Sequence, residues 1–339
     1  MQDRISRYLL GNFSTVFFPL FNALLLIASV VLFVQISAMT SILKVTFGEM
    51  LSLYALALPE ILLYTLPVSF FAAGVITLTK LSFDLELIVL FTLRANMGHI
   101  LKPFLFLAVI LSSALLVIGL WLKPKTWYKS KELIYQKEDS AQLNVKASEF
   151  GQKFGDWLLF IGKEKGDRLE NVVLFTKDPE KEVFIRSGAA RIENVENNFR
   201  LTLDQGNTFN IHRSKIDQVE FEKMIVNERA GLNRLDYQGV LAYWQDKLTS
   251  KKKKKDLAQT ILIALFPLLS LVMIVATGII NPRYQKNRSY LYIIGGTLYY
   301  YLLVFTVAAP LPFASLAVVP AVWLGSSYLL YRKRVRPIY

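Results

Sequence analysis

The sequence predicts an α-helical membrane protein with six transmembrane helices in two groups of three. An antiparallel, jellyroll-like β domain is expected between the groups. Three observations support this fold class. The chain has 339 residues, of which 53% are hydrophobic. Its apolar residues are clumped into runs long enough to cross a bilayer, which takes ~20 residues of helix. One long polar block, with charges every few residues, separates the first three apolar runs from the last three.

The polar block divides the chain into three expected parts. Residues 1–122 hold spans 1–3, residues 123–255 hold the β domain with its flanking helices, and residues 256–339 hold spans 4–6. The first apolar run is longer than the ~7–15 residues of a signal peptide, which indicates an uncleaved span. Residues 1–14 are expected to form an amphipathic lead-in on the membrane surface. The spans are expected at residues 16–37, 51–79, 103–122, 257–280, 290–308 and 312–331.

Within the polar block, apolar and polar residues alternate in short runs. In residues 199–203, Phe, Leu and Leu alternate with Arg and Thr, and this period of two predicts a strand. Residues 204–207 contain Asp, Gly and Asn and are expected to turn the chain back. Several such runs predict an antiparallel sandwich or jellyroll-like sheet. The aromatic residues expected in its interior are Trp157, Phe160, Phe199, Phe209 and Phe221.

The distribution of Lys and Arg predicts the orientation. The short loop after span 1 holds only Lys44. The positive-inside rule therefore places both termini in the cytoplasm and the polar block outside. Counting the lysines that flank the block evens the two sides, but long translocated domains follow the rule poorly. The basic residues of the opposite side are Arg4, Arg7, Lys80, Arg94, Lys102, Arg283, Lys286, Arg288, Arg332, Lys333, Arg334 and Arg336.

Composition and motifs argue against several kinds of function. The net charge of +13 does not require nucleic acid, since many basic residues flank apolar runs, where lipid phosphates and the positive-inside bias account for them. The chain has no Cys, which excludes disulfides and thiolate sites. It has no G-x-x-x-x-G-K-[ST] motif, so ATP would have to bind a partner. With two His residues and no H-E-x-x-H, neither a catalytic site nor a cofactor is expected.

Two stretches are candidates for function. Glu60 lies inside span 2, and an intramembrane carboxylate is a functional candidate. The alternative, a hydrogen-bonded or water-facing residue near the outer interface, is favoured because span 2 is long enough to tilt. After span 2, residues 80–97 predict a short amphipathic helix, with Asp84 and Glu86 near its start, where the helix dipole favours acids. Such a helix fits the lipid surface or a groove of a cytoplasmic partner equally well.

Local motifs resemble a known family over essentially the whole chain. Leu58-Pro59-Glu60, Leu66-Pro67, and Lys80-Leu81 followed by Glu86-Leu87 are similar to the second span and following helix of the lipopolysaccharide-export permeases LptF and LptG, also called YjgP/YjgQ. Ile280-Asn281-Pro282-Arg283 resembles the turn after their fourth span, which is found in LptF more than in LptG. The three-plus-three layout around a β-rich insert agrees, and the resemblance favours an LptF-like chain.

The resemblance implies a non-catalytic permease subunit of an ABC-type exporter in the bacterial inner membrane, with residues 123–255 in the periplasm. It would extract lipopolysaccharide from that membrane and pass it to a periplasmic bridge. The implied partners are a cytoplasmic ATPase dimer similar to LptB, a sister permease similar to LptG, a bridge protein similar to LptC, lipopolysaccharide and membrane lipids. The helix after span 2 would be the coupling helix, and spans 1 and 5 would line the lipid cavity. The implied ATPase-coupling residues are Leu81, Asp84, Glu86, Leu87 and Arg94, and the implied substrate path holds Lys44, Glu60, Trp157, Phe160, Phe199, Phe209 and Phe221.

The sequence departs from the family pattern at two places. Arg94 stands where the family usually has Gly, and residues 35–39 lack the basic residues that LptF relatives often carry near the outer end of span 1. Two other classes of function stay open on the residues alone. One is a membrane-anchored scaffold or sensor whose outer domain binds a ligand, and the other is a lipid-modifying membrane enzyme. A scaffold needs no ATPase, whereas a permease should bind one.

Overall fold

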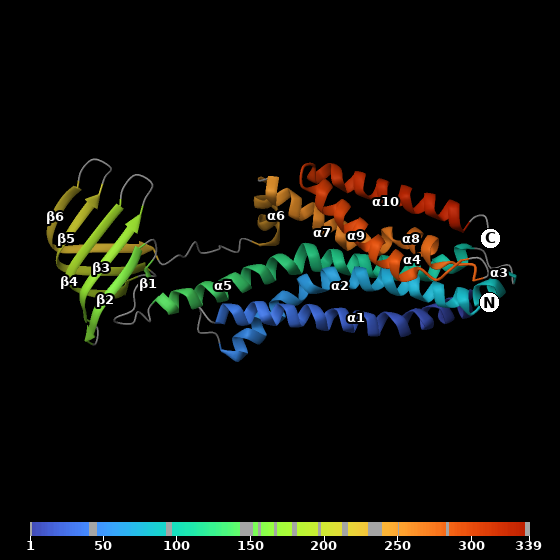
Figure 1. Cartoon of the computed structure of the whole chain (residues 1–339), viewed down its shortest axis with the longest axis horizontal. Helices are drawn as coiled ribbons and strands as arrows, with labels where there is room; N and C mark the ends of the chain where they lie inside the picture. Colours follow the sequence, from blue (N-terminus) through green and yellow to red (C-terminus); the bar gives the residue numbers. More distant parts are fainter. Residues whose placement is uncertain are drawn as a thin grey trace. The chain divides into compact units, whose positions relative to one another are not determined.

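The computed structural model describes residues 2–40, 46–92, 97–142, 152–154, 157–165, 168–177, 182–195, 198–211, 216–229, 239–249, 251–282 and 285–335. The chain divides into two compact units (Figure 1). The helical unit comprises residues 1–37, 48–129 and 237–339, and the β unit comprises residues 38–47 and 130–236.

The helices carry the membrane-spanning segments. Within the described residues, five helices are long and apolar enough to cross a membrane, and a sixth span results if the bent pair α7–α8 is counted as one. The described helices are α1 (Gln2–Thr40), α2 (Phe47–Phe83), α3 (Glu86–Thr92), α4 (Met97–Val117), the π-helical turn η1 (Ile118–Leu122), α5 (Lys123–Gln142), α6 (Val240–Thr249), α7 (Lys251–Leu269), α8 (Leu271–Gly278), α9 (Ser289–Ala308) and α10 (Pro312–Arg334). Together with the inserted β sheet described below, they confirm the predicted fold class.

Helix α1 differs from the expected surface lead-in followed by a separate span. It runs unbroken from Gln2 to Thr40, and its early residues Leu9 and Phe13 are buried in the helical core. The ring of Phe13 packs 5.4 Å from Phe70 and 5.5 Å from Phe104. The hydrophobic surface removed from water there fixes the start of α1 to the unit, so the surface lead-in was wrongly predicted.

The helix pair at which the fourth span was expected is bent by 45° between α7 and α8. Pro267 lies one turn before the bend and has no N–H to donate to the carbonyl of residue 263, which weakens the helix there. Ser270 donates its hydroxyl to the Pro267 carbonyl at 3.0 Å. The indole of Trp323 in α10 donates to the Leu269 carbonyl at 3.1 Å. The carbonyls at the bend therefore find side-chain partners inside the unit.

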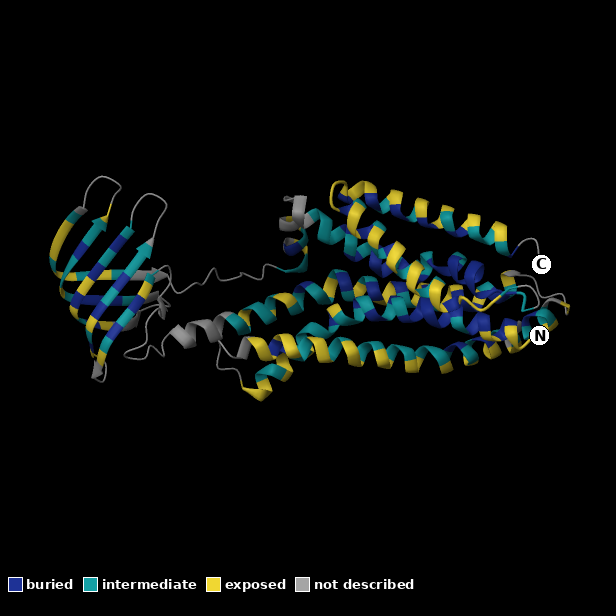
Figure 2. Cartoon of the chain, viewed as in Figure 1, coloured by how far each residue is buried: buried dark blue, intermediate teal, exposed yellow. Residues whose placement is uncertain are grey.

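Small residues allow α2 and α8 to pack closely. A Cβ at Gly278 would lie 2.8 Å from the Cβ of Leu78, and one at Gly74 would lie 2.8 Å from Ile274 Cδ1. Ser82 links the ends of the two helices, since its hydroxyl oxygen accepts the N–H of residue 280 at 3.2 Å, while its proton is shared between the Leu78 carbonyl at 2.8 Å and the Gly278 carbonyl at 3.3 Å. Figure 2 shows α8 and the second half of α2 as the most buried part of the helical unit.

The β unit contains one antiparallel sheet. Its strand order follows the sequence, so each strand pairs with the next and the topology is a meander. One face is packed into a core of Leu, Ile and Val side chains from β2 to β5. The strands are β1 (Gln152–Phe154), β2 (Trp157–Lys165), β3 (Arg168–Lys177), β4 (Glu182–Val195), β5 (Asn198–Ile211) and β6 (Ile216–Arg229).

The turn expected at residues 204–207 is a kink within the continuous strand β5. Gln205 has a φ of 51°, and Asn171 in β3 has a φ of 55°. The strand registers on either side place Gly162, Asn171, Gly188 and Gln205 in one row across β2–β5. We call this row the crease. Each of its four residues is either a glycine or a residue with left-handed backbone, and side chains that face the core on one side of the crease continue on the other face beyond it. The Asp, Gly and Asn residues thus mark a change of face and not a reversal of the chain.

Candidate functional site

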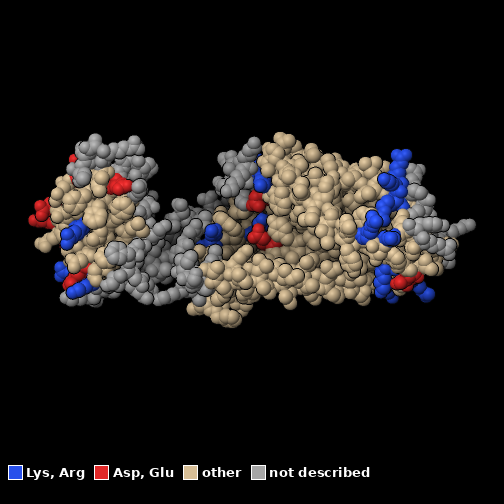
Figure 3. Space-filling view, in the orientation of Figure 1, with Lys and Arg blue, Asp and Glu red and all other residues tan. Residues whose placement is uncertain are grey.

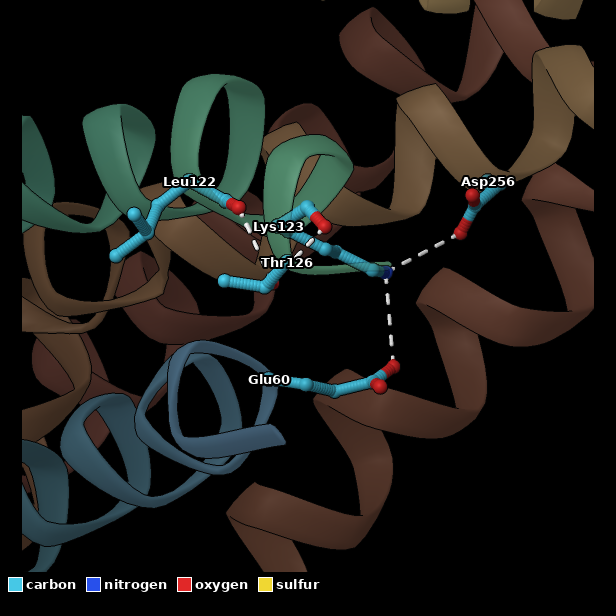
Figure 4. A network of polar contacts seen from close by, with 5 residues as sticks. All are labelled: Glu60, Leu122, Lys123, Thr126 and Asp256. Atoms are coloured by element: carbon cyan, nitrogen blue, oxygen red, sulfur yellow. Dashed lines mark hydrogen bonds and ion pairs between the residues drawn. The ribbon is translucent and has the colours of Figure 1, made fainter. Parts of the chain in front are cut away.

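A three-residue ion-pair network joins three helices of the helical unit, and we call it the Lys123 network. The Nζ of Lys123 lies 3.7 Å from Glu60 Oε1 in α2 and 3.5 Å from Asp256 Oδ1 in α7 (Figure 4). The side chain of Lys123 is 13% exposed, whereas those of Asp256 and Glu60 are 34% and 58% exposed. One nearly buried cation thus holds two partly exposed carboxylates. Glu60 therefore has an ion-pair partner inside the protein, in agreement with its interpretation as a partnered residue near the outer interface.

The π-helical turn η1 presents Lys123 to its partners. Pro124 has no N–H for the Leu120 carbonyl four residues earlier, and its ring would clash with that carbonyl in a regular α-helix. The chain widens into η1 at this point, and the indole of Trp244 in α6 donates to the Leu120 carbonyl at 2.7 Å. Gly119 in the same turn lets α7 approach, since a Cβ there would lie 2.6 Å from Thr260 Cγ2.

An aromatic cluster covers the network on the side of α6. The ring of Tyr243 lies 5.9 Å from Trp127, 5.7 Å from Tyr128 and 5.0 Å from Trp244. Burial raises the pKa of the Tyr243 hydroxyl above its usual range, and the negative charge of Asp256 raises this pKa further. The hydroxyl therefore stays neutral at physiological pH and adds no charge to the network.

A second cluster lies at α3, where the ends of the chain also lie (Figure 1). The hydroxyl of Tyr8 in α1 donates to Glu86 Oε2 in α3 at 2.5 Å. Leu85, between α2 and α3, has a φ of 62°, a conformation that costs a residue other than glycine about 1–2 kcal/mol. Leu85 and Val89 are exposed, whereas Leu87 is buried. Leu87 thus anchors one side of α3, while Leu85 in the preceding turn and Val89 in the helix are exposed apolar side chains near the acidic Glu86.

Basic residues gather at the same end of the helical unit. Figure 3 shows blue Lys and Arg side chains clustered there, next to a wide band without charged residues. The guanidinium of Arg334 stacks on Tyr292 with its Cζ 4.5 Å from the ring centroid, and it donates to Gln285 Oε1 at 3.4 Å. This stacking holds the end of α10 against the start of α9. A cationic end beside an apolar band is what the positive-inside rule describes for a membrane protein.

A family model with the description "Lipopolysaccharide export system permease LptF/LptG" matches residues 7–331, nearly the whole chain. The chain belongs to the LptF/LptG family. This family consists of transport permeases and not of catalysts, so the chain is a multi-pass membrane protein of lipopolysaccharide export. None of the curated proteins matches it.

The LptF/LptG permease places its expected coupling residues in two environments. Leu81 and Leu87 are buried anchors, whereas Asp84 is exposed and Glu86 is half-buried. The short helix begins only at Glu86, because α2 continues to Phe83. Arg94 lies outside the described residues, as does Lys44 of the expected substrate path.

The expected aromatic interior of the β unit is divided between two faces. Trp157 and Phe221 pack against the core of the sheet. Phe160 lies between the buried residues Leu159 and Ile161 and therefore points to the opposite face. Phe209 shares that face, since it pairs with Phe184 in register and their rings are 6.2 Å apart. The side chain of Phe199 lies outside the described part of β5.

Several residues of the LptF/LptG permease were missed by the sequence analysis. Tyr8 was assigned to a surface lead-in, Lys123 was counted only as a flanking cation, and Asp256 was not singled out. The signal for Asp256 was its position as an acid directly after the five lysines 251–255. Pro124, one residue after Lys123, was the signal for an irregular turn. Nothing in the sequence places Lys123 and Asp256 in one network with Glu60, because the three residues come from separate helices.

Proposed function

We propose that this permease is the LptF-like half of an ABC-type exporter in the bacterial inner membrane. It pairs with an LptG-like sister permease over a dimer of an LptB-like ATPase. The exporter extracts lipopolysaccharide from the membrane and passes it through the β unit to an LptC-like bridge. The observation that carries this proposal is the family match over residues 7–331, because it includes the spans, the short cytoplasmic helix and the β insert together.

The geometry of α3 supports its role as the coupling helix. The turn before α3 exposes Asp84 and Leu85, and α3 itself exposes Val89 beside the half-buried Glu86. A short helix with such side chains fits a groove of a partner protein, where apolar anchors give affinity and charges give register. The buried Leu87 fixes the other face to the spans, so a push on α3 reaches the helical unit.

The charge distribution supports a cytoplasmic location for both ends of the chain. Most of the described basic residues of the helical unit gather at its α3 end (Figure 3), as the positive-inside rule requires for the cytoplasmic side. On this proposal, residues 1–122 and 256–339 form the membrane part, and residues 123–255 lie in the periplasm. Because the chain has no Cys, a Lys223→Cys variant, exposed on β6, tests this directly. An impermeant thiol reagent should label it in intact spheroplasts.

The exposed faces of α1 and α9 support a substrate path along spans 1 and 5. The most apolar stretch of α1 holds no buried residue, although it is long enough to span the bilayer. Large apolar residues of α9 are exposed in the same way, including Leu291, Ile294, Leu298 and Leu302. Such faces need lipid or a second protein beside them. In the proposed exporter they face the sister permease and the acyl chains of lipopolysaccharide.

Charge reversal at Glu86 tests the proposal. Glu86→Lys should reduce co-purification of the ATPase, because a cation replaces the acid on the proposed docking face. The control is Glu220→Lys, which reverses an exposed charge on β6 and should leave the yield of ATPase unchanged. Wild-type co-purification together with normal lipid-stimulated ATP turnover in Glu86→Lys would remove the coupling role of α3.

A further inference from the structure

A hydrogen bond links the first span directly to the proposed coupling helix. The Tyr8 hydroxyl in α1 donates to Glu86 Oε2 in α3 over a sequence separation of 78 residues. Tyr8 is 47% exposed, so water competes for this bond and its contribution to stability is small. Because this hydrogen bond adds little stability but joins the first span to the proposed coupling helix, its position favours a role in communication between α1 and α3.

Helix α1 is built to move as one piece with this bond at its end. It is continuous over residues 2–40, with Pro19 in its interior. Leu9 and Phe13 in its first turns are buried in the helical core. Further along, the hydroxyls of Ser29 and Tyr54 are 2.8 Å apart, and residues 18–28 between these attachments are not buried. Pro19 removes one hydrogen bond of the helix, but the helix continues on both sides of it, so α1 is a continuous element along which a displacement at Tyr8 is passed.

The carboxylate of Glu86 can serve two partners at once. An ionised carboxylate has two oxygens that accept hydrogen bonds, and Tyr8 occupies Oε2. The other oxygen remains available to a cationic or N–H group of a docked protein. The Tyr8 hydroxyl thus fixes the rotamer in which Glu86 meets its partner.

We propose that Tyr8 is a positioning residue of the exporter: it orients Glu86 toward the ATPase and passes the displacement of α3 to α1, the span that faces the lipid. This inference rests on the proposed function, since it assumes that α3 docks on the ATPase. Its prediction is a loss of coupling between ATP hydrolysis and transport, with assembly preserved.

The test uses Tyr8→Phe, which removes only the hydroxyl, in the full exporter reconstituted in proteoliposomes that contain lipopolysaccharide. Co-purification of the ATPase and ATP turnover should stay within about twofold of wild type, while lipopolysaccharide released per ATP should fall about fivefold, the change that corresponds to the net contribution of one ordinary hydrogen bond. Tyr328→Phe, which removes another exposed tyrosine hydroxyl, on α10, is the matched control and should behave as wild type.

A second variant shows whether Tyr8 acts through Glu86. In a Glu86→Ala background, which removes the acceptor of the Tyr8 hydroxyl, Tyr8→Phe should add no further loss of lipopolysaccharide released per ATP. An unchanged ratio in Tyr8→Phe, an additive loss in the double variant, or loss of the ATPase from the Tyr8→Phe complex would each overturn the positioning role. Failure of the proposed function is distinguished by Glu86→Lys: if that variant keeps its ATPase and its turnover, α3 is not the docking element, whatever Tyr8→Phe does.

Discussion

Replacing Lys123 by Met should destabilise the helical unit by about 2–3 kcal/mol. Removing one partner of a fully buried ion pair costs about 3–5 kcal/mol, whereas an exposed pair contributes about 0.2–1 kcal/mol. The Asp256 arm lies between these limits, since that carboxylate is 34% exposed, and the Glu60 arm is close to the exposed limit at 58%. We assign about 2 kcal/mol to the first arm and about 0.5 kcal/mol to the second.

The assay is thermal unfolding of the purified protein in detergent, followed by tryptophan fluorescence. The expected order of destabilisation is Lys123→Met, then Asp256→Asn, then Glu60→Gln. Lys129→Met is the matched control, because Lys129 is an exposed lysine further along the same helix, and its unfolding midpoint should match wild type. A double variant of Lys123 and Asp256 should lose less than the sum of the single losses, because the two side chains share one interaction.

Two results would refute this energetic assignment. One is a midpoint for Lys123→Met equal to that of Lys129→Met, which would mean that the ammonium is fully hydrated and its contacts add nothing. The other is a larger loss for Glu60→Gln than for Asp256→Asn, which would reverse the order that the exposed fractions of the two carboxylates predict.

The remaining predictions concern backbone positions. Gly278→Ala should destabilise the helical unit by about 1–3 kcal/mol, because the added methyl would lie 2.8 Å from Leu78 Cβ. Its control is Gly295→Ala, where a Cβ meets nothing within 4 Å. In the same thermal assay, this control should unfold at the wild-type midpoint. Gln205→Gly should stabilise the β unit by up to about 1 kcal/mol by relieving its left-handed backbone, whereas Gln218→Gly, at an exposed position of β6, should destabilise it by about 0.5–1 kcal/mol. If urea unfolding shows that both glycine variants lower the free energy of unfolding by the same amount, the backbone at Gln205 is not strained.

The spans were predictable because burial in lipid demands long apolar runs, whatever the tertiary contacts are. Each expected span falls on a helix or helix pair of the structure. The prediction failed where packing decided the outcome. Residues 1–14 are polar enough to lie on a surface, yet Leu9 and Phe13 find a buried site against other helices, and the local pattern carries no information about that site.

The β unit shows the same division between local and non-local information. The alternation of apolar and polar residues predicted the strands. This pattern assumes that every second side chain stays on the same face along the whole strand. The crease breaks this assumption at Asn171 and Gln205, so a segment with turn-like composition was placed in a turn. The close approach at Gly206, where a Cβ would lie 2.2 Å from the Arg186 carbonyl, depends on the neighbouring strand and could not be inferred from one sequence.

The candidate site was only partly predictable for a related reason. Glu60 and Glu86 were found because an acid in a span and an acid at a helix start are unusual in themselves. Their partners Lys123 and Tyr8 come from other helices, and many Lys and Tyr residues in the chain have similar surroundings in sequence. Only the packing of the helices selects these two.

The π-helical turn before Lys123 takes up one extra residue without redirecting the third span. Such a turn holds one residue more than an α-helix needs for the same advance, so the residues on either side of Ile118–Leu122 keep the faces that they would have in an unbroken helix. Deleting one residue from this turn would therefore leave Lys123 on the side of Glu60 and Asp256, but it would press the Pro124 ring against the carbonyl four residues earlier. The extra residue is thus what allows a proline to follow the cation inside a continuous helix.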